Sequence, residues 1–109
     1  MAAALTLADA KAVLDAALAK AEEIGQPMNV AVVDAGAHLV TFARQDGAIL
    51  ASIDIATRKA RTSALLRMTT AQLGEAAQPG APLYGVETTN GGLVVFGGGI
   101  PLERDGEVV

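Results

Sequence analysis

Apolar residues recur at helical spacing in two long stretches of the chain, residues 6–24 and residues 49–66. Apolar positions three or four residues apart predict amphipathic helices. Thr6, with Asp9 three residues later, matches the capping box at the start of the first helix. Gly25 is typical of a residue just after a helix end.

Short runs rich in β-branched residues predict the strands. Residues 28–34 and 39–44 are two such runs, and the glycine-containing turn between them predicts a β-hairpin. Residues 93–96, Leu-Val-Val-Phe, predict a third strand. Arg104-Asp105-Gly106 predicts a hairpin turn that leads into a last strand beginning at Glu107.

A short third helix is expected between the second helix and these last strands. Thr69 or Thr70 is its cap, and it ends near Gln78, where Pro79-Gly80 follows. The resulting order, α-β-β-α-α-β-β, predicts an α+β fold in which an antiparallel sheet is flanked by helices. We expect one domain that covers residues 1–109.

Composition narrows the classes of function. The core is expected to be thin, because only 3% of the 109 residues are aromatic. A domain of this size is only marginally stable alone, so we expect it to form an oligomer. The absence of cysteine excludes thiolate metal sites and disulfides, and a single histidine excludes a multi-histidine site. A net charge of −4 argues against a nucleic-acid partner. No apolar run approaches the roughly 20 residues that span a membrane, so we predict a cytoplasmic protein without a membrane partner.

The run Gly97-Gly98-Gly99, followed by Pro101, is the most unusual feature of the chain. Glycine allows close backbone approach and positive φ. A kinked strand packed on a helix is the favoured interpretation, and the backbone wall of a flat ligand pocket is the alternative. Phosphate binding is not expected, because no helix follows the glycines.

The ten positions from 58 to 67, in and just after the second predicted helix, contain four basic residues: Arg58, Lys59, Arg61 and Arg67. A solvated helix face is the favoured interpretation. The alternative is an anchor for a ligand carboxylate, formed by Lys59 or Arg61, because both supply charge-assisted donors. Arg44, at the end of the first hairpin, is a further candidate for ligand binding.

Other chemistry rests on single residues. His38, in the hairpin turn, is expected to be solvated, but it is also a candidate haem-iron ligand, since an axial site needs only one histidine. Met68 is a second, soft candidate that more often belongs to a core. Lys59, Asp46 and Glu87 are the acid–base candidates if the protein is an enzyme that acts on a carbonyl or aromatic acid substrate.

Seven stretches, spread in order over nearly the whole chain, carry a resemblance that no single motif would establish. They are residues 5–10, 30–36, 44–48, 52–56, 59–62, 79–85 and 96–102. Together they resemble the GlcG/HbpS family of small haem-binding or so-called haem-degrading proteins, a domain that also forms the C-terminal part of one type of corrinoid adenosyltransferase.

The resemblance implies a profilin-like fold and homo-oligomers, from dimers to larger rings. It also implies a small-molecule ligand, with haem or another planar acidic molecule as the first choice. A structural oligomerisation module beside a metabolic enzyme is the remaining alternative.

The resemblance further implies a glycine-rich strand, similar to Gly-Ala-Ile-Gly-Val-Ser-Gly, and a helix after the last predicted strand. We expect both to be missing from residues 1–109, which would leave an unpaired sheet edge that a partner chain can cover.

Overall fold

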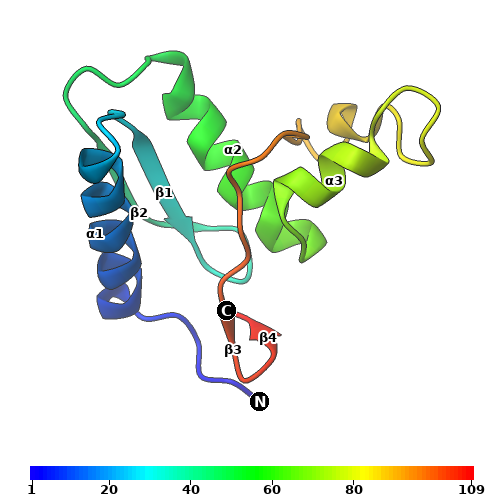
Figure 1. The fold of residues 1–109 in the computed structure, drawn as a ribbon. Helices are drawn as coiled ribbons and strands as arrows, with labels where there is room; N and C mark the ends of the chain where they lie inside the picture. The colour runs from blue at the N-terminus through cyan, green and yellow to red at the C-terminus, as the bar shows by residue number, and fades with distance from the viewer.

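A computed structural model describes all 109 residues, Met1–Val109. Helices and short strand pairs are combined in a mixed α+β arrangement (Figure 1). The elements are α1 (Leu7–Glu23), β1 (Asn29–Val33), β2 (Leu39–Arg44), α2 (Ala51–Leu66), α3 (Thr70–Ala76), the short 3₁₀ helix η1 (Val86–Thr88), β3 (Glu103–Arg104) and β4 (Glu107–Val108).

The capping residues predicted at the starts of two helices are confirmed. The Thr6 side chain accepts a hydrogen bond from the Asp9 N–H, and the Asp9 carboxylate accepts one from the Thr6 N–H, each at 3.0 Å. Thr69 caps α3 in the same way, with Gln72 as its partner. Gly25 follows the end of α1 with φ +70°, the left-handed conformation that commonly ends a helix and that glycine adopts easily.

The first predicted hairpin is also confirmed. β1 and β2 pair antiparallel, with a bulge between Val32 and Val33. The carboxylate of Asp34 orders the turn, because it accepts the N–H of Gly36 at 3.0 Å and that of His38 at 2.9 Å. Both α1 and α2 pack against β1.

The strand predicted at residues 93–96 is wrong. These residues join no strand pair, because the structure contains only the pairs β1–β2 and β3–β4. Their backbone bonds to other partners: the N–H of Leu93 donates to the Glu87 carbonyl, and the N–H of Val94 donates to the Thr62 hydroxyl at 3.1 Å. Leu93 and Val94 are buried, so the apolar pattern reflected packing against helices rather than a ladder.

The largest fully buried side chains lie where α2 meets α3: Thr62, Ser63, Thr70 and Leu73. Gly99 crosses this corner. Its N–H donates to the Thr70 hydroxyl at 2.8 Å, and its carbonyl accepts the Thr70 N–H at 3.0 Å. A Cβ at position 99 would lie 2.6 Å from the Lys59 carbonyl oxygen and 2.8 Å from the Ser63 hydroxyl. Gly99 is therefore a glycine because of close approach.

The hairpin β3–β4 is tied to the start of α1, and the two lie at the same end of the molecule (Figure 1). The turn between these strands is the one predicted at Asp105-Gly106. Nη2 of Arg104 lies 2.7 Å from Oδ2 of Asp9, and Nη1 donates to the Ala3 carbonyl at 2.9 Å. The Arg104 guanidinium and the hydrogen bonds from Thr6 lower the pKa of Asp9 to about 2.

We expect Gly99→Ala to lower the free energy of unfolding by about 1–3 kcal/mol, because the added methyl group has no space at the α2–α3 corner. Gly97→Ala is the matched control, since a Cβ there would meet only Ala71 at an ordinary 3.6 Å. Urea denaturation measures both variants. Equal stability of the two would contradict the close-packing explanation.

The Asp9–Arg104 pair should stabilise the protein at neutral pH and lose this effect in acid. Since folding lowers the pKa of Asp9, the stabilisation is present above pH of about 4 and disappears as the pH falls toward 2. Asp9→Asn should lower the melting temperature at pH 7, and the difference from the unaltered protein should shrink on acidification. Asp15→Asn, on an exposed α1 carboxylate, is the control. A difference that does not change with pH would show that the pair does not act as described.

Candidate functional site

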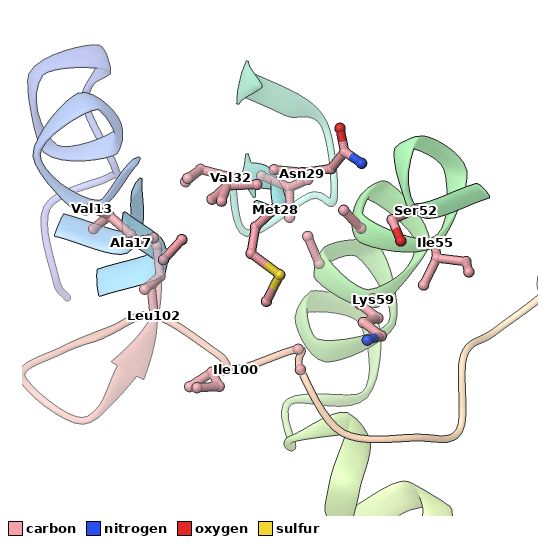
Figure 2. Close-up of a pocket in the computed structure, with 18 of the residues that line it drawn as sticks. Val13, Ala17, Met28, Asn29, Val32, Ser52, Ile55, Lys59, Ile100 and Leu102 are labelled. Atoms are coloured by element: carbon pink, nitrogen blue, oxygen red, sulfur yellow. The ribbon is translucent and has the colours of Figure 1, made fainter. Parts of the chain in front are cut away.

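A cavity of about 520 Å³ lies between α1, β1, α2 and residues 98–102 (Figure 2). Its walls are mainly apolar: Val13 and Ala17 come from α1, Val32 from β1 and Ile55 from α2. Met28 and Lys59 both extend into the space. A volume of this size and lining is typical of small-ligand sites.

One wall of the cavity is the edge of β1 that β2 does not use. No residue of β2 lines the cavity, whereas all of β1 does. The Gln45 N–H donates to the Met28 carbonyl, and antiparallel pairing alternates along a strand. The backbone groups of Asn29 and Ala31 therefore face away from β2, on the cavity side.

Lys59, Phe96 and Gly98 form a second feature, the lysine rim. Nζ of Lys59 lies 4.5 Å from the centroid of the Phe96 ring, a cation–π contact. A Cβ at Gly98 would lie 2.7 Å from this Nζ, so the glycine makes room for the ammonium group. Lys59 forms no salt bridge, and burial lowers the pKa of its ammonium group.

The basic residues predicted together on the second helix separate in the structure. Arg58 bonds to Asp54 at 2.8 Å, as helical spacing predicts, and its Nη1 donates to the Gly91 carbonyl at 2.6 Å. Arg58 thus ties the loop around Gly91 to α2. Lys59 turns toward the cavity, while Arg61 does not line it.

The structure brings together four of the predicted site residues and separates the others. Lys59, Gly98, Gly99 and Pro101 line the cavity. The residues outside its lining are Arg44, Arg61, Gly97, Asp46, Glu87, His38 and Met68. No acid–base set gathers around Lys59 inside the cavity, because Asp46 lies in the turn after β2 and Glu87 in η1.

His38 lies in the hairpin turn with 81% of its side chain exposed. Its Nδ1 is 3.2 Å from Oδ1 of Asp34. Hydrogen bonds from the His38 and Gly36 N–H groups lower the pKa of Asp34. Asp34 thus caps the turn, and Arg44 forms no salt bridge with it. No cluster of three or more His, Asp or Glu side chains is placed to hold a metal ion.

Sequence reasoning missed Phe96 and the edge of β1. Phe96 had a signal, because it is one of three aromatic residues and directly precedes the glycine run. The free edge of β1 had no signal, because the unbroken run Val30-Ala31-Val32-Val33 indicates only that both faces of the strand are covered.

We expect the amine of Lys59 to titrate below the usual pKa of a lysine. Its desolvation disfavours the charged form, so its pKa falls below the usual value near 10.5. The side-chain NMR signals of Lys59, followed from pH 7 to about pH 11, measure its midpoint. A Lys59 midpoint at or above the usual value of about 10.5 would contradict the described environment.

No helix of the structure combines the length and the apolar character that crossing a membrane requires.

Residues 5–109 match the family model described as haem-degrading protein HbpS-like. Among curated relatives, an uncharacterized 15.0 kDa protein from the dhaT-dhaS intergenic region of Citrobacter freundii is 44% identical and aligns with 98% of this chain and 76% of its own. The corrinoid adenosyltransferase PduO of Salmonella typhimurium is 39% identical, and the match covers 97% of this chain but only 32% of that enzyme.

Solved structures agree with this assignment. The crystal structure of protein ORFY from Klebsiella pneumoniae matches all of this chain and 76% of its own, with a TM-score of 0.95 and 34% identity. A PduOC:haem complex matches 97% of this chain and 78% of its own, with a TM-score of 0.92 and 36% identity. The family resemblance predicted from seven stretches is thereby confirmed, and the chain belongs to the HbpS-like family of proteins described as haem-degrading.

Proposed function

We propose that this protein binds haem, or another flat molecule with carboxylate groups, at the lysine rim. The observation that carries the proposal is the pairing of an ammonium group that has no carboxylate partner with an exposed aromatic ring, Lys59 beside Phe96. A carboxylate from a ligand would complete the charge pair, and charge-assisted hydrogen bonds of this kind are among the stronger ones.

Phe96 and Gly98 supply the complement for a flat face. Phe96 is 54% exposed although it belongs to the glycine-rich segment that packs on α2. Gly98, with φ +133°, carries no side chain that would block approach beside the ring. A planar ring system could stack on Phe96 while its acidic substituent reaches Lys59.

The relatives favour haem over other planar ligands. PduOC, which shares the fold at 36% identity, was crystallised as a haem complex. The residues at the lysine rim fit the carboxylates and the flat face of haem. They provide no imidazole, since His38 lies outside the cavity lining.

We also propose that the protein forms a homo-oligomer. Ile49, Leu50 and Ile53 lie together around the start of α2, and their exposed fractions are 65%, 71% and 37%. Contiguous exposed apolar side chains are typical of protein interfaces. Such an interface would also let Arg44, Arg61, His38 or Met68 of one subunit approach the rim of another.

Titration with haemin, followed by the Soret band, tests the proposed site. Lys59→Gln should weaken binding about tenfold, because it removes the charge but keeps a polar side chain of similar length. Lys11→Gln, which removes an exposed lysine outside the cavity, is the control and should bind as the unaltered protein does. Equal affinity of both variants would place the ligand elsewhere.

The same titration addresses the iron ligand. His38→Ala should leave the position of the Soret maximum unchanged, because His38 is exposed and is separate from the cavity. A shifted maximum would instead assign the axial position to this histidine, reached across a subunit interface. The two substitutions therefore report on different parts of the bound ligand.

A further inference from the structure

We propose that the amine of Lys59 condenses with a small apolar aldehyde to form an imine, so that the lysine rim also captures carbonyl compounds covalently. The reaction goes beyond the proposed function, because it requires the free amine of Lys59 and no bound haem.

Imine formation is a balanced condensation that releases one water. The nitrogen lone pair of the neutral amine attacks the carbonyl carbon, and a proton passes from nitrogen to oxygen. The resulting carbinolamine loses its hydroxyl group, which leaves as water with the remaining nitrogen proton, and a C=N bond is formed. Hydrolysis reverses the sequence. The step needs no oxidant or reductant, because no electrons are gained or lost.

The environment of Lys59 favours the neutral form of its amine. A nucleophilic lysine must first lose its proton, and removal from water favours this loss. The half-buried Lys59 forms no salt bridge that would hold the ammonium form, and desolvation lowers its pKa. Lys20, by contrast, has its Nζ 3.4 Å from a carboxylate oxygen of Glu23. Lys59 therefore meets the first requirement for nucleophilic attack.

Phe96 and Gly98 position this amine where a molecule from solvent can reach it. Nζ lies 4.5 Å from the centroid of the Phe96 ring, and a Cβ at Gly98 would lie 2.7 Å from Nζ and 3.1 Å from Cδ of Lys59. Both Phe96 and Gly98 are exposed, so the nitrogen is open to approach from their side. A cation–π contact at an exposed ring is weak, so it orients the amine without preventing the loss of its proton.

Apolar side chains on the cavity side of Lys59 specify the rest of the aldehyde. Ile55 lies one helical turn before Lys59 on α2, and Met28 and Ile100 line the same cavity (Figure 2). Met28 and Ile100 are exposed, so contact with an alkyl chain would remove apolar surface from water. The one carboxylate of the cavity lining, Asp34, accepts hydrogen bonds within its own turn. The arrangement therefore suits capture of an aldehyde that has an apolar chain.

Reductive trapping of the imine tests the proposal. The protein is incubated at about pH 7 with pentanal and sodium cyanoborohydride, which converts an imine into a stable secondary amine. Peptide mapping by mass spectrometry then locates the label. Lys11, an exposed lysine outside the cavity lining, is the internal reference. We expect labelling at Lys59 to be about tenfold faster than at Lys11, and equal rates at the two positions would overturn the proposal.

The length of the aldehyde tests the contribution of the apolar side chains. Acetaldehyde has the same reactive group but a shorter alkyl chain, so its ratio of Lys59 to Lys11 labelling should be smaller than that of pentanal. An equal ratio for the two aldehydes would contradict the assignment of an apolar substrate.

Two variants control the experiment. Lys59→Arg removes the nucleophile and should reduce total labelling to that of the remaining amines, whereas Lys11→Arg should leave the rate at Lys59 unchanged. The comparison of Lys59 with Lys11 within the unaltered protein decides the outcome even if a variant folds poorly.

Haemin separates this proposal from the proposed function. Haemin bound at the lysine rim should slow the labelling of Lys59, because its carboxylate would pair with the same nitrogen. Haemin that binds, as followed by the Soret band, without slowing this labelling would place the haem elsewhere and leave selective imine formation intact. Unselective labelling, together with a haemin affinity that falls in Lys59→Gln, would overturn the imine proposal alone.

Discussion

The close approach of Gly99 to the corner between α2 and α3 is the contact on which the rest of the structure depends. Two hydrogen bonds between the Gly99 backbone and Thr70, one to its hydroxyl and one from its N–H, hold the glycine there. The Lys59 carbonyl and the Ser63 hydroxyl lie where a side chain would begin. This contact directs the chain past α2 toward the C-terminal hairpin. Arg104 then fixes that hairpin to Asp9 at the start of α1.

The functional features follow from the path of this segment. With Gly99 held at the corner, Gly98 lies beside the Lys59 ammonium, and Phe96 lies within cation–π distance of it. The residues that continue to position 102 form the wall opposite β1. One packing constraint thus produces both the lysine rim, which suits a flat acidic ligand, and one wall of the cavity.

Local features could be predicted from the sequence, and features that need a distant partner could not. The Thr6 and Thr69 caps depend on residues three positions away, so their patterns were sufficient. Residues 93–96 have strand composition, but a ladder needs a neighbour, and here Thr62 takes the bond at Val94. Helical spacing placed Lys59 and Arg61 among the anchor candidates, but only the tertiary structure shows which one faces the cavity.

Ligand mapping by NMR tests the central claim, that the lysine rim binds a flat acidic molecule, most directly. Gallium protoporphyrin is a suitable probe, because it has the shape and carboxylates of haem without paramagnetism. The account predicts that the largest shift changes and the intermolecular contacts fall on Phe96, Gly98 and Lys59. Contacts confined to the hairpin turn around His38, with the Phe96 ring unaffected, would contradict it.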